Sequence, residues 1–268
     1  MTKLFARFLV GLVTVATAFL GRWRRLTVRA RVHDALTPES VVTVNGTTLT
    51  LLVPDRKSVY WPRHGYASEP NTLAWIDGFT DTDVLYDVGA NVGAYALYAA
   101  KARGVRVVAF EPSPFSFRAL VHNLQRNRLT DKVTPLCLAA NDTTGATPFY
   151  LSGTDTGSVG HTLSGDARDR KGFAMQTLAF RLDDIAAFAG VPKPTQMKID
   201  VDGIELPILE GAKSLLSDPR LKSVMIEVLT HDEPDRRRIA ELLRECGLAP
   251  AADWRDDCSD NRLFVRNA

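Results

Sequence analysis

The stretch Val84-Leu85-Tyr86-Asp87-Val88-Gly89-Ala90-Asn91-Val92-Gly93 decides the fold of this chain. A short apolar run ends at an acid, two glycines follow four positions apart, and residues 94–100 have a helical pattern. This order predicts a strand, a tight glycine turn and the N-terminus of a helix. Such a unit cradles a nucleotide-like ligand at the start of its helix.

The glycine spacing separates this turn from the common dinucleotide-binding motif. That motif is G-x-G-x-x-G, whose first two glycines let the backbone approach a diphosphate closely. Here the pattern is D-x-G-x-x-x-G, and its carboxylate would repel a diphosphate but attract a cation or an ammonium group. The pattern suits S-adenosylmethionine, which has an amino acid tail and a sulfonium but no phosphate. We expect five residues of the turn to bind this cofactor: Asp87, Gly89, Ala90, Asn91 and Gly93.

The composition is that of an ordinary globular protein. The 268 residues are 45% apolar and 24% charged with a net charge of +2, so the overall balance does not favour a nucleic acid partner. The cysteines Cys137, Cys246 and Cys258 are far apart and odd in number, and they show no zinc or disulfide spacing. These features predict a reducing compartment, and we expect a cytoplasmic protein.

The N-terminal segment is unusual because its residues 8–20 are uncharged and mostly apolar, while arginines are dense in residues 22–31. The run is shorter than the roughly 18 residues of a membrane span. One interpretation is peripheral attachment of residues 4–31 to the inner face of a membrane. The alternatives are a packed helix, a wrongly assigned start, or a cleaved signal peptide, which the following arginines oppose.

We divide the chain into a hydrophobic and basic segment (residues 1–32), a hairpin and linker region (33–80) and a nucleotide-binding domain (81–268). Asn45-Gly46 between β-branched runs predicts a hairpin over residues 41–53. From residue 83 onward strands alternate with helices, which predicts a parallel sheet covered by helices on both faces. The fold class is therefore α/β, a doubly wound Rossmann-like sheet with an N-terminal β-hairpin extension. We expect strands at 84–87, 105–110, 133–139, 196–200, 222–228 and 263–265, and helices at 93–102, 114–127, 182–189, 204–216 and 234–246.

Polar side chains follow most of the predicted strands. In an open parallel sheet ligands bind beyond the carboxyl ends of the strands, so these side chains should converge on one crevice. Glu111 ends the second strand about two dozen residues after Asp87, where an acid that binds ribose hydroxyls is expected. Pro112 stiffens the turn beside it. We expect Glu111, Pro112, Asn141 and Asp142 to complete the cofactor site.

A second block of sequence is Lys198-Ile199-Asp200-Val201-Asp202-Gly203-Ile204-Glu205-Leu206-Pro207-Ile208-Leu209-Glu210-Gly211-Ala212. Alternation places Lys198, Asp200 and Asp202 on one face of an extended segment. Three charges on one face are costly to bury, so we expect them at the open end of the sheet, facing a ligand.

The chain resembles the FkbM family of S-adenosylmethionine-dependent methyltransferases in three blocks, Asp87–Gly93, Phe110–Pro114 and Lys198–Ala212, and the similarity runs from about residue 83 to 230. The resemblance implies a doubly wound methyltransferase fold, usually with O-methylation of a hydroxyl on a sugar, lipid or secondary metabolite. One departure is Asp202, where the family generally has Glu, so the reach of this carboxylate differs.

O-methylation requires a base that removes the hydroxyl proton of the acceptor. Asp200 is the first candidate, His231 the second and His161 a third, while Lys198 is placed to stabilise an acceptor oxygen or to neutralise its neighbouring acids. We expect no metal. The alternative is a divalent cation held by Asp200, Asp202 and Glu205.

Residues 141–180 interrupt the alternation with a polar, glycine-rich insertion. We expect this insertion to cover the pocket and to select a small-molecule, sugar or lipid-linked acceptor.

Two other functions remain open: an NAD(P)-dependent oxidoreductase on the same fold, and a binding module without catalysis. The oligomeric state is left open by the sequence.

Overall fold

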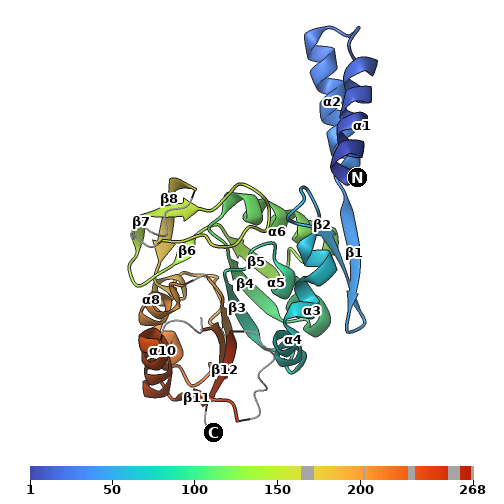
Figure 1. Ribbon diagram of the computed structural model, residues 1–268. Coiled ribbons are helices and arrows are strands. Elements are labelled where there is room, and N and C mark those ends of the chain that lie inside the picture. The colour runs from blue at the N-terminus through green and yellow to red at the C-terminus, as the bar shows by residue number, and fades with distance from the viewer. Residues whose placement is uncertain (164–171, 202, 229–232, 253–259, 267–268) are drawn as a thin grey trace. The chain divides into compact units, whose positions relative to one another are not determined.

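The computed structural model describes residues 1–163, 172–201, 203–228, 233–252 and 260–266 (Figure 1). The chain forms two compact units, Met1–Glu39 and Ser40–Ala268. His231, Asp202 and Cys258 lie outside the described residues.

The first unit contains helices α1 (Thr2–Ala16) and α2 (Arg22–Leu36), neither of which buries a residue. Phe5 and Phe8 on α1 are 64% and 60% exposed. Within the described part of the chain, no helix combines the length and apolar character needed to cross a membrane. Peripheral attachment through residues 4–31 therefore stays a prediction.

The second unit is built on a seven-stranded sheet of order β11-β12-β10-β9-β3-β4-β5 (Figure 1). The strands β10, β9, β3, β4 and β5 are parallel, whereas β12 runs antiparallel to both of its neighbours. The bounds are β3 (Val84–Val88), β4 (Arg106–Phe110), β5 (Val133–Leu136), β9 (Gln196–Ile199), β10 (Ser223–Glu227), β11 (Leu248–Pro250) and β12 (Asn261–Arg266). The predicted fold class is confirmed, although the sequence did not indicate β11.

The strand order reverses at β3. From β3 the chain moves outward through α5 (Ala94–Arg103) to β4, and through α6 (Pro114–Asn127) to β5. The next strand of this sheet along the chain, β9, returns to the opposite side of β3. The carboxyl ends of β3 and β9 therefore flank a topological switch point, where open α/β sheets bind ligands.

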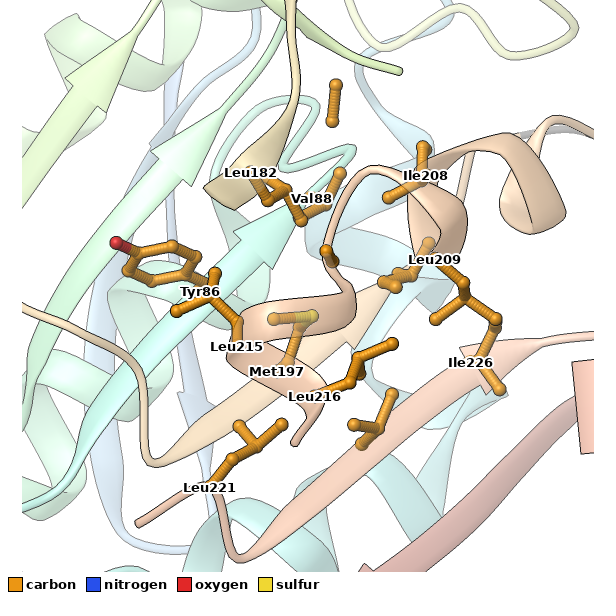
Figure 2. Close-up of a cluster of buried hydrophobic side chains, with 14 of the residues drawn as sticks. Tyr86, Val88, Leu182, Met197, Ile208, Leu209, Leu215, Leu216, Leu221 and Ile226 are labelled. Carbon is orange, nitrogen blue, oxygen red and sulfur yellow. The ribbon is translucent and has the colours of Figure 1, made fainter. Parts of the chain in front are cut away.

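Alternating side chains of the strands pack against helices on both faces of the sheet. On one face Tyr86, Met197 and Ile226 join a buried cluster with α7 (Leu182–Ile185), α8 (Glu205–Glu210), α9 (Lys213–Leu216) and α10 (Glu233–Glu245), and Figure 2 shows its centre. On the other face Leu85 packs with α4 (Pro70–Asp77), α5 and α6. Burial of apolar surface on both faces explains why these strands read as nearly continuous hydrophobic runs.

The predicted hairpin is present as β1 (Glu39–Val44) and β2 (Thr47–Leu52), with Asn45 and Gly46 both at positive φ in the turn. Two asparagines of α6 connect β2 to the domain. Asn123 accepts a hydrogen bond from Leu52 N (2.7 Å), and Asn127 bonds both the N–H and the carbonyl of Thr50 (3.0 and 2.7 Å). From β2 the chain continues through the π-helical turn η1 (Trp61–Gly65) and α3 (Tyr66–Ser68) to α4.

The insertion forms a separate three-stranded sheet, β6-β8-β7 (Figure 1). Its strands are β6 (Ala139–Ala140), β7 (Gly145–Leu151) and β8 (Phe173–Phe180). The strand expected over 133–139 is therefore divided between β5 in the central sheet and β6 in this one.

Two predicted helices are wrong in their extent. The helix expected over 182–189 is only α7, which ends at Ile185, and the helix expected over 204–216 is divided. Residues 204–216 form two short helices, α8 and α9, interrupted at Gly211 and Ala212. A Cβ at Gly211 would lie 2.1 Å from the carbonyl oxygen of Asn141, so the chain passes too close to the insertion for a side chain at this point. The apolar spacing correctly identified the buried face but could not reveal this close approach.

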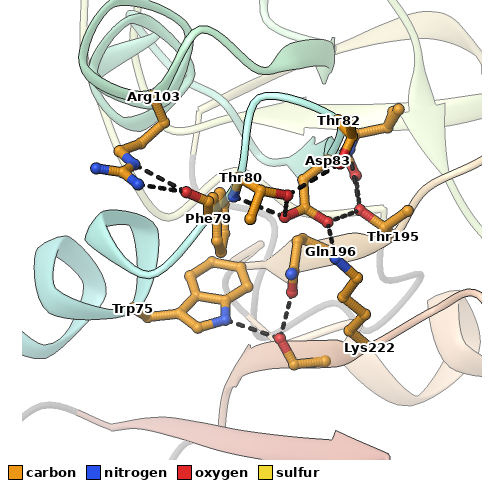
Figure 3. A network of polar contacts seen from close by, with 11 residues as sticks. Trp75, Phe79, Thr80, Thr82, Asp83, Arg103, Thr195, Gln196 and Lys222 are labelled. Carbon is orange, nitrogen blue, oxygen red and sulfur yellow. Dashed lines mark hydrogen bonds and ion pairs between the residues drawn. The ribbon is translucent and has the colours of Figure 1, made fainter.

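A polar network fastens the opposite end of the sheet, before β3 and β9 (Figure 3). Asp83 is 2% exposed and accepts hydrogen bonds from Thr195 (2.6 Å), Lys222 (2.7 Å) and Thr80 (2.9 Å). Burial by itself would raise the pKa of Asp83, but these hydrogen bonds outweigh it and lower the pKa to about 2. The network joins the starts of three strands through one ionised carboxylate.

Candidate active site

A cavity of about 310 Å³ lies at the carboxyl ends of β3, β4, β9 and β10, at the switch point. Volumes of this order are typical of small-molecule sites. Its lining includes most of the residues selected from the sequence: Asp87, Gly89, Ala90, Asn91, Glu111, Pro112, His161, Lys198 and Asp200.

The turn after β3 is fixed to both neighbouring strands. The amides of Gly89 and Ala90 donate to the carbonyl of Phe110 at the end of β4 (3.0 and 2.9 Å). Gly89 has φ +86, and a Cβ there would lie 1.9 Å from the carbonyl oxygen of Asp200. Glycine is thus required both by the left-handed backbone and by the contact with the end of β9.

Gly93 contributes to packing between helices, and its predicted contact with the cofactor stays a prediction. It also has positive φ (+84), but a Cβ there would lie 2.3 Å from Cδ1 of Leu120 in α6, and Gly93 is absent from the described cavity lining. The second glycine of the motif therefore permits close packing of α6 against the start of α5.

Glu111 is held rigidly at the end of β4. Its Oε2 accepts the amide of Asn91 (2.8 Å), its Oε1 accepts the amide of Ser113 (2.7 Å), and the residue is only 5% exposed. A carboxylate offers lone pairs for about four hydrogen bonds. Its position in the cavity, next to the β3 turn, is therefore compatible with the predicted binding of a diol.

Asp87 and Lys198 are direct neighbours because parallel strands β3 and β9 pair them in register. Both are 2% exposed, and Lys198 Nζ also forms a short ion pair with Asp200. Burial would lower the pKa of Lys198, but the carboxylates of Asp200, Glu69 and Asp87 outweigh it and raise that pKa. These charges therefore favour the protonated form of Lys198 inside the site.

The surroundings of Asp87 favour its neutral form, whereas those of Lys198 favour its charged form. Burial raises the pKa of Asp87 to about 6, aided by the charges of Asp200 and Glu69 and opposed by Lys198. Its Oδ2 is buried and has no hydrogen-bond partner in the described structure. An acid of this kind at the mouth of the β3 turn favours a cationic ligand.

Sequence reasoning missed several residues of the site. Glu69 lies just before α4, lines the cavity, and accepts hydrogen bonds from Thr72 and Asn261 (2.9 Å each). Tyr95 on α5 places its ring 4.9 Å from Lys198 Nζ, a cation–π contact. The aromatic residues Tyr60, Trp61 and Phe149 also line the cavity. The aromatic content of residues 54–80 was visible in the sequence, but no local pattern connected it with the site.

His161 is placed in the cavity wall with a defined tautomer. Its Nδ1 accepts the backbone N–H of Ser152 (3.1 Å), so the proton of the neutral ring resides on Nε2. Burial lowers the pKa of His161, aided by the charge of Lys57, which keeps the ring neutral. In this tautomer the Nδ1 lone pair accepts the Ser152 amide and Nε2 carries the proton, so His161 is oriented to donate a hydrogen bond to a ligand, and its role as a base stays a prediction.

The remaining predicted residues lie apart from the described lining. Asn141 and Asp142 do not line the cavity, where Leu138, Ala139 and Ala140 stand instead. Glu205 is buried beside the site, accepts the amide of Gly203 (3.0 Å), and has a pKa raised chiefly by burial. Among the described residues, no three His, Cys, Asp or Glu side chains gather as a metal site, and Asp202 lies outside those residues.

The donor set fits S-adenosylmethionine. Two buried acceptor atoms of the β3 turn, Asp87 Oδ2 and Asn91 Oδ1, have no partner in the described structure and belong to residues that line the cavity. Buried acceptors without partners are costly, and an ammonium group or hydroxyls would satisfy them. Phe110, Pro112 and Leu138 supply apolar surface on the Glu111 side, as a purine base requires.

The chain is similar in sequence to known methyltransferases. The model of the methyltransferase FkbM domain matches residues 87–248. The chain is 31% identical over 170 residues to the hexuronic acid methyltransferase AglP of Haloferax volcanii, covering 63% of this chain and 64% of that protein. It is 30% identical over 203 residues to the 31-O-demethyl-FK506 methyltransferase FkbM of Streptomyces tacrolimicus, covering 64% of this chain and 74% of that protein.

A solved structure, the methyltransferase FkbM from Methylobacillus flagellatus KT, superposes with a TM-score of 0.49 at 19% identity, over 70% of this chain and 44% of that one. For AglP, the aligned part of this chain spans slightly under two thirds of that protein's length. The domain match extends over more than half of the chain and includes the end of β3 and all of β4, β9 and β10, whose carboxyl ends form the cavity. The chain belongs to the FkbM methyltransferase family.

Proposed function

We propose that this protein transfers a methyl group from S-adenosylmethionine to a hydroxyl group of a sugar, a sugar-containing lipid or another small molecule. The observation that carries the proposal is the cavity at the switch point, in which Asp87, Glu111 and the Lys198–Asp200 pair meet. The family membership supports methyl transfer as the reaction.

The two carboxylates have separate roles in donor binding. Glu111 binds the ribose hydroxyls, because it ends β4 beside the glycine turn and its side chain is fixed by two backbone amides. Asp87 faces the cationic amino acid end, which stabilises its ionised form against the cost of burial. Gly89 allows the backbone to approach this ligand without a side chain.

When bound, the cofactor supplies a methyl group activated by a sulfonium. The protein must then orient the acceptor oxygen and accept its proton. Asp200 is the residue we assign to the proton, since its carboxylate ends β9 in the cavity and is 29% exposed there. Lys198 fixes the Asp200 carboxylate and stabilises negative charge on the acceptor oxygen.

The acceptor class is inferred from the relatives and the cavity. One relative is named for methylation of a hexuronic acid and the other for methylation of 31-O-demethyl-FK506, a compound named for a missing O-methyl group. The cavity combines aromatic rings of Tyr60, Trp61 and Phe149 with the polar groups of His161 and Glu227. A hydroxylated ring has an apolar face and polar edges. Aromatic side chains can pack on that face while the polar groups bind its hydroxyls, so this lining suits such an acceptor.

Isothermal titration calorimetry tests donor binding. We expect binding of S-adenosylmethionine and no binding of NADH by the wild type, and at least tenfold weaker binding of S-adenosylmethionine by Glu111→Ala, because two charge-assisted contacts to ribose are lost. Glu245→Ala is the matched control, since that side chain is 63% exposed. Binding of NADH alone, or equal affinity of the Glu111 variant, contradicts the proposal.

A turnover assay separates the enzyme from a binding module. We expect methylation of methyl β-D-glucuronide or of another hydroxylated ring by the wild type, followed by mass spectrometry. Asp200→Asn should retain donor affinity within a few fold and lower kcat by about 10²–10⁴, the usual contribution of a general base. Donor binding without turnover on any hydroxyl acceptor supports the module instead.

We further propose that residues 4–31 bind an anionic membrane surface peripherally. Exposed apolar side chains on α1 are followed by Arg22, Arg24, Arg25 and Arg29 on α2, and such a combination gives two signals for membrane binding. Cosedimentation with phosphatidylglycerol vesicles should decrease strongly for Phe5→Ser/Phe8→Ser. Equal binding of this variant and the wild type contradicts the anchor.

A further inference from the structure

Two segments that are about a hundred residues apart in sequence form one wall of the cavity. Residues 55–61 follow the hairpin and contribute Tyr60 and Trp61, while residues 153–161 belong to the insertion and contribute Ser158, Val159 and His161. We call these two segments together the clasp. The first segment lies outside the matched family domain of residues 87–248.

Asp55 lies at the centre of the clasp. Its Oδ1 accepts the amides of Lys57 and Ser58 (3.0 Å each), which forms a local turn. Its Oδ2 accepts the amide of Thr156 in the other segment (2.7 Å). Burial raises the pKa of Asp55, but these hydrogen bonds outweigh it and lower the pKa, so the carboxylate is ionised at neutral pH. The bond between the segments is therefore charge-assisted.

Further contacts fix the insertion loop over the start of α6. The amide of Gly157 donates to Ser116 Oγ in the first turn of α6 (3.2 Å). Gly157 has φ +75, and a Cβ there would lie 3.1 Å from Trp61 Nε1 and 3.6 Å from Val92 Cγ1. Val92 belongs to the turn after β3, so the loop packs against the turn to which the proposed function assigns donor binding.

The burial pattern shows that this loop is packed, although its composition is polar. Thr156 and Ser158 are only 7% and 4% exposed. By contrast, the ion pair between Lys57 and Asp155 (3.3 Å) joins side chains that are 46% and 51% exposed. Lys57 Nζ also donates a long hydrogen bond to Ser158 Oγ (3.4 Å). Exposed ion pairs contribute little and this bond is long, so the 2.7 Å Asp55–Thr156 bond is the main polar connection between the segments.

We propose that Asp55 is a positioning residue that locks residues 153–161 over the methyl-donor half of the cavity, and that release of this lock limits dissociation of the donor. The inference rests on the proposed function for the identity of the ligand. The lock itself is a property of the protein without ligand.

The decisive variant is Asp55→Asn. Asparagine keeps one acceptor oxygen for the amides of Lys57 and Ser58 but replaces the charged acceptor of Thr156 with an amide. Lys57→Met is the matched control, because it removes the exposed ion pair with Asp155 and the long hydrogen bond to Ser158 but keeps the Asp55–Thr156 bond. Gly157→Ala disturbs the same lock from the insertion side, through Trp61 and the positive φ.

Hydrogen–deuterium exchange of the ligand-free full-length protein tests the lock directly. We expect amides of residues 155–158 to exchange at least tenfold faster in Asp55→Asn and Gly157→Ala, and at wild-type rates in Lys57→Met. Exchange in α10 and the central sheet should be unchanged. Equal exchange of the loop in all four proteins overturns the lock, whatever the ligand.

Stopped-flow displacement of S-adenosylmethionine tests the consequence. We expect the dissociation rate to rise about tenfold in Asp55→Asn, the effect of one lost charge-assisted bond, with Tm and single-turnover rate at saturating donor near those of the wild type. A faster-exchanging loop with an unchanged dissociation rate overturns the role in donor retention. If the wild type does not bind S-adenosylmethionine at all, the proposed function fails together with this role, while the exchange data still decide the lock.

Discussion

Asp87→Asn should make the protein more stable and at the same time weaken its ligand binding. Asp87 is buried at the β3 turn beside Lys198, Asp200 and Glu69, and its pKa is raised from 3.8 to about 6. One pKa unit corresponds to about 1.4 kcal/mol, so ionised Asp87 costs the folded state about 3 kcal/mol relative to its neutral form.

The pH dependence follows from the direction of this shift. Because the folded pKa exceeds the unfolded one, the favourable contribution of protonated Asp87 is complete below about pH 4 and is lost as the pH rises through about 6. Asparagine has nearly the shape of the neutral acid. At pH 7.5 we expect the free energy of unfolding to increase by about 1–3 kcal/mol, the lower figure applying if the new amide leaves a hydrogen bond unmade.

Urea unfolding followed by circular dichroism at pH 4.5, 6 and 7.5 measures this effect. The stability difference between variant and wild type should grow across this range, while calorimetry at pH 7.5 should show at least tenfold weaker binding of S-adenosylmethionine. Asp131→Asn is a control at an exposed position. A variant that is less stable than the wild type at pH 7.5, or a difference that does not depend on pH, would refute the reasoning.

Three further outcomes are expected from substitutions away from Asp87. Asp83→Asn should destabilise the protein by about 1–2 kcal/mol above pH 5, and the half-exposed Lys222 limits the effect by screening. The pKa of Asp83 is lowered from 3.8 to about 2, so the stability that its carboxylate gives is complete above about pH 4, is partly lost at pH 3, and disappears as the pH falls through 2. Urea titrations at pH 7 and pH 3 check this, and an equal loss at both values contradicts it. Gly89→Ala should cost about 2–4 kcal/mol, from the left-handed backbone and the contact with the Asp200 carbonyl, and should abolish donor binding in calorimetry. Arg266→Lys should lower Tm by several degrees, because the guanidinium donates to the carbonyls of Leu221, Cys246 and Leu216 and an ammonium cannot reach all three; unchanged melting would show that these contacts contribute nothing.

The local parts of the site were predictable because their geometry is encoded by neighbouring residues. The D-x-G-x-x-x-G pattern indicated the β3 turn, and Gly89 indeed has the positive φ and the close backbone approach that only glycine permits. The acid after the second strand indicated Glu111, which does line the cavity. Alternation of strands and helices indicated the doubly wound sheet.

Other expectations depended on contacts that no local pattern contains. Asn141 and Asp142 were selected because they follow a strand, but that strand divides into β5 and β6, and the cavity is lined by the apolar residues just before them. Gly93 was assigned to the ligand, whereas Leu120 from the next helix explains its small size. His161 was considered as a base. Only the tertiary contact between the Ser152 amide and its Nδ1 determines that the ring proton lies on Nε2.

By itself, the sequence determined the fold class, the β3 turn, the acid at the end of β4 and the family. These features arise from short stretches in which strand, turn and helix preferences agree. Tertiary structure decided which charges meet. The register of β3 against β9 places Asp87 beside Lys198, α4 brings Glu69 to the same cation, and docking of residues 153–161 on Asp55 closes one wall. Such contacts join residues about 100 to 130 positions apart, so they are fixed by packing of whole elements and leave no periodic signal in the chain.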